Sequence, residues 1–344
     1  MAKRNYSVMK RNKRMEPAHL RFSVPLTTLT SETSSANEYL DLSQIASILN
    51  RRFYRQGLNW VVGSIKHMAQ TSDGSSVTGF VGVSKLPETW VMKNAWTKGF
   101  KAWQKMNNEA LAESQSVKPK FLDFKIYADA DHHQAGFDAN LLPFGANGNL
   151  YNPGEWQPSK IVVPTAGAGV ESRELIATGA SYPGPGFSTL DAVSLIEGYA
   201  ASRALPQPED PHTPADAEDA SGVTPQNWLA ALFNQGIAQD EEVLEDMITE
   251  NNQAPYPFED DGTNLDTMYP GGANQAPGLA EHDFQYITGT TVGGHTFLAP
   301  GCFPCGLMKI QTSATVPVGV NLFQGLFIEL VPGDHRGYMA ESMA

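Results

Sequence analysis

The sequence VNLFQGLFIELV, residues 320–331, carries large apolar side chains on both faces of the β-strand that it predicts. Side chains alternate between the two faces of a strand. Phe323 and Phe327 fall on one face, and Leu322, Leu326 and Ile328 fall on the other. A strand of this kind is typical of a sheet that is covered on both sides. We therefore expect residues 320–331 to form a central strand with cover on each face.

Eight further segments have strand-like patterns, and together they indicate a mainly β protein. In residues 21–27, for example, Phe22, Val24 and Leu26 alternate with more polar neighbours. The chain has 31 glycines and 23 prolines, a content that favours turns and short strands over long helices. The predicted strands are residues 21–27, 58–68, 76–84, 121–128, 159–164, 172–178, 284–292, 306–313 and 320–331.

Long segments separate several of these strands, and this spacing predicts insertions in a β framework. Helical spacing of apolar residues predicts helices over residues 41–53, 90–111, 190–203 and 227–250. The fold that we expect is a single jelly roll, an antiparallel β-sandwich with helical and loop insertions. Its predicted parts are a basic disordered N-terminal arm (1–18), a first part of the jelly-roll shell domain with inserted helices (19–182), an acidic Pro/Gly-rich and partly helical insertion (183–277), and the last strands with a C-terminal tail (278–344).

Charge is sorted along the chain. Residues 1–120 contain eighteen Lys and Arg against eight Asp and Glu, a net charge of +10, although the whole chain has a net charge of −13. Residues 204–308 contain seventeen Asp and Glu and no Lys or Arg, a net charge of −17. Such sorting creates oppositely charged surfaces. We expect the basic part to face a polyanion and the acidic insertion to project outward, away from it.

The first fourteen residues are the most basic stretch, with six cations and no acid. The residues between the cations offer no apolar face, which predicts a disordered arm. An arm of this kind neutralises phosphates without reading bases. A solvated tail with no partner and a nuclear-import sequence are the alternatives. The predicted nucleic-acid-binding residues of the arm are Lys3, Arg4, Lys10, Arg11, Lys13 and Arg14.

The helix predicted over residues 90–111 has an apolar stripe that includes Trp96 and Phe100, and a row of lysines on the opposite side. Stacking aromatic residues would have to share the lysine face for that face to bind single-stranded nucleic acid. We therefore expect the stripe to lie in the core and the lysines to face solvent. The lysines are Lys98, Lys101 and Lys105.

Cys302 and Cys305 have the spacing of a redox dithiol or of half a zinc site. A structural zinc ion needs four ligands, and the chain has no second cysteine pair. A strand-like segment follows the pair, whereas a redox dithiol normally opens a helix that stabilises its thiolate. We therefore expect both cysteines to be packed residues without chemistry.

The sequence DADHH, residues 129–133, directly follows a predicted strand. Carboxylates and imidazoles together can ligate a metal or act as acid and base. Adjacent histidines on an extended chain point to opposite sides, so a polar loop is the preferred interpretation. A metal-dependent hydrolase that uses these side chains stays as an alternative. They are Asp129, Asp131, His132 and His133.

Common catalytic motifs are absent from the sequence. It contains no nucleophile elbow, Walker A loop, HExxH motif or dinucleotide-binding fingerprint. We therefore expect no enzymatic activity, no catalytic residue, no bound metal and no cofactor. The sequence also has no run of eighteen apolar residues, so we expect no membrane insertion.

Two blocks of sequence resemble a known family. Residues 90–114, WVMKNAWTKGFKAWQKMNNEALAES, followed by KPKFLDFKIYADA at 118–130, are similar to a helix-then-strand segment of the capsid proteins of circular Rep-encoding single-stranded DNA (CRESS-DNA) viruses. The most similar are those of the stool-associated smacovirus-like and pecovirus-like lineages. The ending FIELVPGDHRGYMAESMA, residues 327–344, resembles the last strand and tail of the same capsids. The two blocks cover about sixty residues, under a fifth of the chain.

The resemblance implies a capsid protein that self-assembles into an icosahedral shell and packages single-stranded DNA through its basic arm. It implies as partners other copies of the chain, viral single-stranded DNA and a host receptor. It also implies location in the virion, with the host nucleus as a site of assembly. A cellular nucleic-acid-binding module is the alternative function.

A charge count predicts further cations on the inner surface of such a shell. The smallest icosahedral shell has about 60 subunits, so six arm cations in each supply about 360 positive charges. A genome of kilobases carries more phosphates than that, at one per nucleotide. We therefore expect additional phosphate contacts from Arg51, Arg52 and Arg55, or from the lysines of the predicted helix at 98–105.

Overall fold

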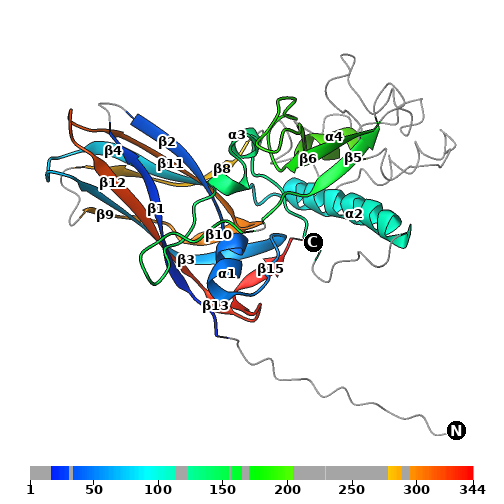
Figure 1. Cartoon of the computed structure of the whole chain (residues 1–344), viewed down its shortest axis with the longest axis horizontal. Helices are drawn as coiled ribbons and strands as arrows, with labels where there is room; N and C mark the ends of the chain where they lie inside the picture. Colours follow the sequence, from blue (N-terminus) through cyan, green and yellow to red (C-terminus); the bar gives the residue numbers. More distant parts are fainter. Residues whose placement is uncertain are drawn as a thin grey trace, which may run out of the picture.

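The computed structural model describes residues 17–30, 34–113, 122–154, 156–164, 170–203, 229, 278–288 and 294–343. Within these ranges the chain forms two opposed antiparallel sheets on one side of the molecule, and helices with a small third sheet on the other (Figure 1). The first sheet has the order β1 (Arg21–Leu29), β12 (Leu322–Leu330), β3 (Leu58–Thr71) and β10 (Gly301–Pro304). The strands β9 (His295–Leu298) and β15 (Ala340–Ser342) also pair with β3.

The second sheet has the order β2 (Ser34–Asp41), β11 (Leu307–Thr315), β4 (Thr78–Lys85) and β8 (Ala280–Ile287). Along the chain, β1 and β3 enter the first sheet while β2 and β4 enter the second. After the long insertion the chain continues with β8 in the second sheet, β9 and β10 in the first, β11 in the second and β12 in the first. This alternation of antiparallel strands between two sheets is the arrangement of a jelly roll. The predicted fold class is confirmed.

The core between the sheets is built from the alternating residues of both. Val24 of β1, Ile65 of β3 and Leu326 of β12 are almost fully buried from the first sheet, as are Val83 of β4 and Ile310 of β11 from the second. Their burial removes apolar surface from water, the main driving force for folding. The alternation of apolar residues in the sequence therefore identified correctly which face of these strands lies in the core.

The expectation that β12 is covered on both faces is wrong within the described chain. Leu322, Leu326 and Ile328 point into the sandwich and are buried. Phe323 and Phe327, on the opposite face, are 52% and 46% exposed. The apolar residues on the outer face of β12 therefore have no adequate cover from the described residues of their own chain.

The strand predicted for residues 121–128 is also wrong, although its described part, 122–128, is extended. Its backbone groups bond mostly to side chains and loops in place of a strand ladder. The amide of Ile126 donates to Gln56 Oε1 at 2.7 Å, and that of Lys125 donates to Ser159 Oγ at 2.9 Å. Only Tyr127 forms an isolated bridge, to Ile176. Alternation in the sequence does not show whether backbone groups pair with a neighbouring strand or with side chains and loops.

The helices predicted over residues 41–53 and 90–111 are confirmed, and the one predicted over residues 190–203 begins only at Leu195, because residues 192–194 form a strand. They are α1 (Leu42–Asn50), α2 (Trp90–Glu113) and α4 (Leu195–Arg203), with a short α3 (Ala130–Ala135) in addition. Residues 227–250 lie outside the described residues except for Leu229, which is buried. α2 and α4 pack beside a small sheet of β5 (Lys160–Pro164), β6 (Val170–Ile176) and β7 (Ala192–Ser194) (Figure 1).

The insertion between β4 and β8 spans residues 86–279, more than the acidic segment 183–277 alone. β7 lies within that acidic segment and pairs in parallel with β6, which precedes it. The boundary that we placed at residue 182 therefore cuts through this small sheet. Six acidic residues between Asp240 and Glu250, within the helix predicted over residues 227–250, lie outside the described residues.

Candidate nucleic-acid interface

The base of the N-terminal arm is anchored to the end of α1. The six predicted arm cations lie outside the described residues, which begin at Pro17. The carbonyl of Pro17 accepts a hydrogen bond from Arg52 Nη1 at 3.3 Å. The amide of His19 donates to Asn50 Oδ1 at 3.0 Å, and Tyr338 donates its hydroxyl to the carbonyl of His19 at 2.7 Å. The arm therefore leaves the sandwich next to the loop that carries the predicted interior arginines.

The caps at the two ends of α1 determine where that loop begins. Asp41 caps the helix by accepting from the amides of Ser43 and Gln44, at 2.8 and 3.3 Å. At the other end Arg51 takes the left-handed conformation, with φ of 52°, which stops the helix and turns the chain back toward β3. Arg51, Arg52 and Arg55 are all exposed in this turn. The structure thus brings the three predicted arginines together at the base of the arm.

A fourth arginine, Arg336, joins this group and was missed in the sequence. Its Nη1 donates to the carbonyl of Phe53 at 2.6 Å, and its own carbonyl accepts from the hydroxyl of Tyr54 at 3.0 Å. Arg336 is exposed and has φ of 50° in a turn just before Tyr338. Arg336 lies more than 280 residues from Phe53 in the sequence, so no local pattern indicates this contact. We call Arg51, Arg52, Arg55 and Arg336 the basic rim.

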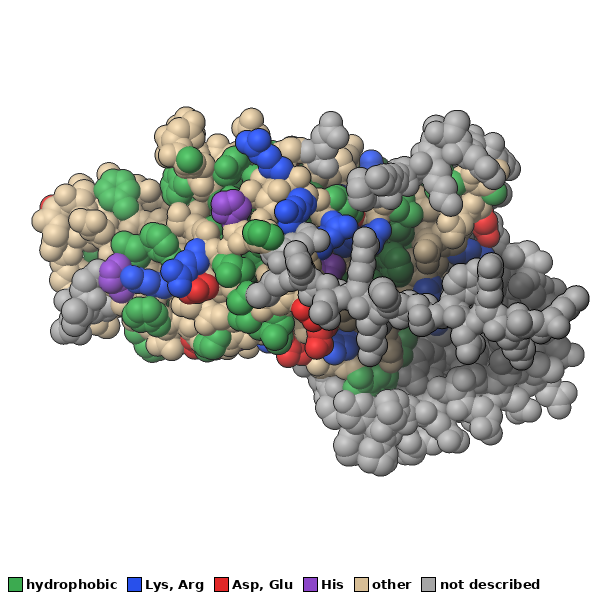
Figure 2. Space-filling model, turned by 90° about the horizontal axis from the view of Figure 1, so that it is seen from below, with side chains coloured by type: hydrophobic (Ala, Val, Ile, Leu, Met, Phe, Trp, Pro, Cys, Tyr) green, Lys and Arg blue, Asp and Glu red, His purple; other side chains and the backbone are tan. Residues whose placement is uncertain are grey.

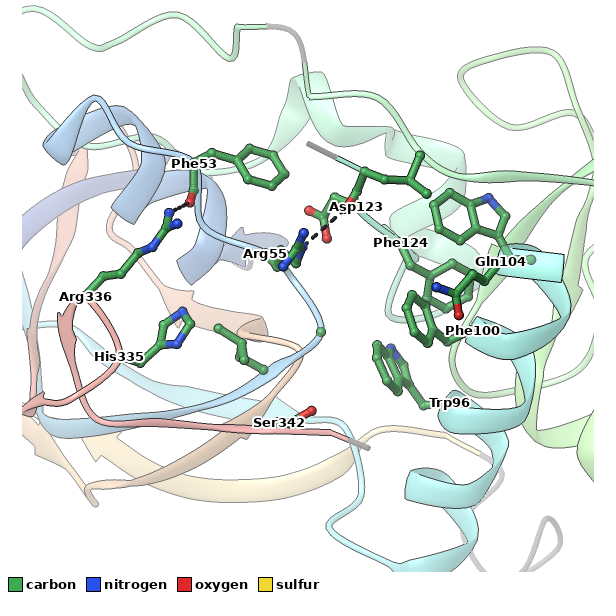
Figure 3. Close-up of a pocket in the computed structure, with 14 residues that line it drawn as sticks. Phe53, Arg55, Trp96, Phe100, Gln104, Asp123, Phe124, His335, Arg336 and Ser342 are labelled. Carbon is green, nitrogen blue, oxygen red and sulfur yellow. Dashed lines mark hydrogen bonds between the residues drawn. The ribbon is translucent and has the colours of Figure 1, made fainter. Parts of the chain in front are cut away.

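A cleft of about 490 Å³ opens beside the basic rim, between the loop after α1, the C-terminal segment and one face of α2. Figure 3 shows Trp96, Phe100 and Gln104 on α2 facing His335, Arg336 and Ser342 across an open space, with Arg55 and Asp123 at one end. Its further lining residues are Phe53, Gly57, Leu58, Trp103, Leu122 and Phe124. We call this space the basic cleft.

The α2 wall of the basic cleft is aromatic. The rings of Trp96 and Phe100 stack with centroids 5.2 Å apart and an angle of 11° between their planes, and Phe124 meets both edge-on. Gly57 faces this wall, and a Cβ atom at that position would collide with the Trp96 ring. The apolar stripe of α2 is therefore core along part of its length, as predicted, but Phe100 is only half-buried and borders an open space.

The lysines of α2 are not all solvated. Lys101 is exposed as expected, whereas Lys98 and Lys105 are half-buried. Lys98 Nζ lies 6.0 Å from the centroid of the Tyr199 ring. None of the three lysines lines the basic cleft.

Asp123 introduces one acidic group into the cleft. Its Oδ2 accepts from the amide of Gln56 at 3.3 Å and lies 4.0 Å from Lys125 Nζ. Burial raises the pKa of the Asp123 carboxyl to about 7, against the opposing effect of Lys125. Nearby, Arg55 Nε donates to the carbonyl of Leu122 at 3.2 Å. At neutral pH the carboxyl is therefore poised between its charged and neutral forms.

The residues of DADHH form a closed cluster, not a polar loop. Asp129 caps α3 by accepting from the amide of His132 at 2.9 Å, and also accepts from the hydroxyl of Tyr39 at 2.6 Å. Lys309 Nζ lies 3.0 Å from both Asp129 and Asp131. We call Asp129, Asp131, His132, His133 and Lys309 the Asp–His cluster.

Both histidines of the Asp–His cluster are fully buried on α3, where the chain was expected to be extended. His132 accepts from the amide of Ala128 through Nδ1, at 3.1 Å, and Nε2 contacts Asn140 Oδ1 at 2.8 Å, which identifies it as a neutral ring with its proton on Nε2. Burial lowers the pKa of His132 to about 4. His133 Nε2 contacts Glu174 at 3.0 Å. Both ring nitrogens of His132 are thus held by residues outside the cluster, whereas His133 Nδ1 is buried without a hydrogen-bond partner in the described structure.

The cysteines lie where β10 leads into β11. Cys305 and Gly306 occupy the two positions of this tight turn with φ of 57° and 68°, and Cys305 is fully buried, which raises the pKa of its thiol. Cys302 is half-buried, and the two thiols are free. Across the ranges that the structure describes, no group of three or more His, Cys, Asp and Glu is placed to hold a metal ion.

No protein-family model, curated protein or solved structure matches this chain. In the described part of the chain, no helix combines the length and apolar character that crossing a membrane requires. The features of the described chain that bear on function are the basic rim, the basic cleft and the exposed surface of the sandwich.

Proposed function

We propose that this protein is a capsid subunit whose copies assemble into an icosahedral shell and package single-stranded DNA. The observation that carries the proposal is an uncovered aromatic surface on the outer face of the first sheet. Phe297, Phe323 and Phe327 are 65%, 52% and 46% exposed. We call these three residues the aromatic face.

The aromatic face crosses several strands of one sheet. Phe327 of β12 lies opposite Lys66 of β3, which in turn lies opposite Phe297 of β9. Lys66 Nζ is 5.7 Å from the centroid of the Phe297 ring. Figure 2 shows hydrophobic side chains interspersed with Lys and Arg over the described part of one face of the molecule. Exposed apolar groups gathered in this way mark interaction surfaces.

The charges beside the aromatic face favour a second copy of the chain as the partner. Arg21 and Glu329 form an exposed pair at 2.8 Å in the row of β1 and β12 next to Phe327. A surface that carries both signs of charge beside apolar rings can be complementary to a copy of itself. A rigid sandwich with such a face is suited to forming the wall of a shell.

The basic rim supports the DNA-binding part of the proposal. Arg51, Arg52 and Arg55 lie at the exit of an arm that contributes six more cations. Cations gathered in this way bind phosphates without a sequence requirement. The resemblance of residues 90–130 and 327–344 to capsid proteins of CRESS-DNA viruses supports the same conclusion, with the virion as the location. The proposal includes a host receptor as a further partner and the host nucleus as the site of assembly.

The assembly can be tested by removing the aromatic face. We expect a Phe323→Ser/Phe327→Ser variant to sediment as small species under conditions in which the unchanged protein sediments as large particles. Its melting temperature should stay close to that of the unchanged protein, because both rings are half-exposed. Val318→Ser is the matched control, since Val318 is 79% exposed and lies outside the aromatic face.

Two results would contradict the proposal. Particles that form equally well in the double variant would show that the aromatic face is not the assembly surface. An unchanged protein that stays monomeric at every salt concentration and pH, while binding DNA through its arm, would favour the cellular nucleic-acid-binding module.

A further inference from the structure

We propose that the basic cleft is a binding site for one nucleotide of a single-stranded nucleic acid, with the base against the aromatic wall and the phosphate at Arg55 and Arg336. This inference rests on the proposed function, in which the protein binds single-stranded DNA. It adds a defined contact with a base to the phosphate contacts of the arm. The cleft offers three features that together fit a nucleotide.

The first feature is an aromatic wall that borders open space. Phe53 and Phe100 are half-buried and line the cleft from opposite sides, and Trp96 stacks on Phe100. Nucleobases of every kind have a π-face, so stacking on such rings tolerates any sequence. A site that packages a whole genome needs this tolerance.

The second feature is a pair of guanidinium groups at the edge of the same space. Arg336 is fixed by its 2.6 Å hydrogen bond to the carbonyl of Phe53, and Arg55 by its 3.2 Å hydrogen bond to the carbonyl of Leu122. Each of these bonds uses one of the five N–H groups of a guanidinium, so other donors are available for a phosphate. Figure 3 shows both side chains beside the aromatic residues that line the cleft.

The third feature is the size and polarity of the space. Its volume, about 490 Å³, falls within the range of small-molecule sites, about 300–1,000 Å³. Gln104 on the α2 wall and Asp123 at one end add polar groups to the lining, as do His335 and Ser342 across the space. Amide and carboxyl groups can donate to or accept from the edges of bases. An apolar ligand would make no use of the remaining N–H donors of the two arginines, so a nucleotide fits the lining better than a lipid chain.

The position of the cleft adds a second reason for a nucleic acid. Arg52, on the same loop as Arg55, contacts the carbonyl of Pro17, where the arm begins. A strand that the arm attracts is therefore delivered to the mouth of the cleft. We infer that the arm supplies long-range attraction and the cleft supplies a short-range contact.

The test compares two oligonucleotides of equal charge on the full-length protein. The probes are a fluorescein-labelled decathymidylate and an abasic oligonucleotide of the same length, with binding measured by fluorescence anisotropy. We expect the abasic strand to bind about tenfold more weakly, because stacking of a base on an aromatic side chain is lost. Phe100→Leu, in the aromatic wall, should remove most of this difference, and Phe144→Leu, which changes an exposed phenylalanine outside the cleft, should preserve it.

The arginines give an independent readout. Arg55→Gln/Arg336→Gln should weaken both probes by about tenfold, whereas Arg21→Gln, at an exposed arginine of the sandwich, should change neither by more than about twofold. Photo-crosslinking of 5-iodouracil in the thymidine probe should label Phe53, Trp96 or Phe100. Circular dichroism of each variant shows whether the fold is intact.

The outcomes separate this inference from the proposed function. Equal binding of both probes by the unchanged protein, or crosslinks confined to residues outside the cleft, would overturn the nucleotide site while leaving particle formation unaffected. Absence of particles together with a preserved preference for the thymidine strand would contradict the capsid proposal and support the site.

Discussion

The basic cleft and the Asp–His cluster both contain charged residues at the junction of the sandwich and its insertion, yet they differ in how those charges are satisfied. In the Asp–His cluster, Asp129 accepts from three groups, and Lys309 is shared between two carboxylates. In the cleft, the side chains of Arg55 and Arg336 each donate to one backbone carbonyl, and both residues are exposed. This difference shows that charged residues that lie close together in the sequence indicate a binding site only where their side chains keep donors or acceptors for a ligand.

The cleft also contains a carboxyl in an unfavourable environment. Asp123 is a buried carboxyl whose pKa rises to about 7 because burial disfavours its charged form. Residues that reduce stability in this way are frequent at sites kept for binding. The cluster, in contrast, places its carboxylates against a lysine, a tyrosine and a helix N-terminus.

The largest expected effect comes from Asp123→Asn. The folded carboxyl binds its proton more tightly than the unfolded one, whose ordinary pKa is 3.8, so the free energy of unfolding falls as the pH rises from about 4 to about 7. Three pH units correspond to at most about 4 kcal/mol. We expect the variant to lack this decline and to be the more stable protein above pH 7, as measured by urea denaturation at several pH values.

Other buried groups do not disturb that comparison. The pKa values of His67 and His132 are lowered to about 4 by burial, so they favour folding as the pH rises, but they do so in both proteins. The difference between the two unfolding curves therefore isolates Asp123. Parallel curves from pH 4 to pH 8 would contradict the assignment.

A second prediction concerns the arm that meets the basic rim. Deleting residues 1–16 removes six cations, and for a single strand the slope of log K against log salt should become shallower by about 4. Between about 50 and 200 mM salt, the affinity of the full-length protein should therefore fall roughly 250-fold further than the affinity of the deletion variant. Titrations of decathymidylate at four salt concentrations measure it. An unchanged slope would show that the arm makes no phosphate contacts.

A third prediction concerns the Asp–His cluster. Asp129→Ala removes the cap of α3, leaves the Tyr39 hydroxyl without its acceptor and removes one of the two carboxylates that Lys309 contacts, so it should lower the free energy of unfolding by about 3 kcal/mol. The folded variant should bind decathymidylate as the unchanged protein does. Weakened binding by a fully folded variant would show that the cluster belongs to the nucleic-acid interface.

The smallest effect is expected for Asp131→Ala. The Asp131 side chain is 64% exposed and contacts only the shared Lys309 among the hydrogen bonds that the structure records for it. Exposed ion pairs contribute about 0–1 kcal/mol, so this variant should unfold within about 1 kcal/mol of the unchanged protein. A loss as large as that of Asp129→Ala would mean that the two carboxylates act as a unit.

Much of the fold was predictable because local patterns report local burial. The alternation of Phe22, Val24 and Leu26 predicted β1, and helical spacing predicted α1 and α2. β2 was missed because its outer half is rich in Ser, Asn and Glu, and only Tyr39 to Asp41 are buried. Residues 295–304 were missed because β9 and β10 are four-residue strands interrupted by Ala299 and Pro300.

The candidate site was predictable only in part, since long-range contacts leave no local pattern. The arginines of the 51–55 loop were identified from charge. Arg336 reaches Phe53 from the other end of the chain, and the aromatic wall of α2 resembled ordinary core. The burial of His132 and His133 was also beyond local reasoning, because it depends on Asn140 and Glu174.

The most direct test of the account is negative-stain electron microscopy of the purified full-length protein, across a range of salt concentration and pH. We expect uniform, closed, roughly spherical particles made of many copies of the chain. A protein that stays monomeric under every condition would contradict it.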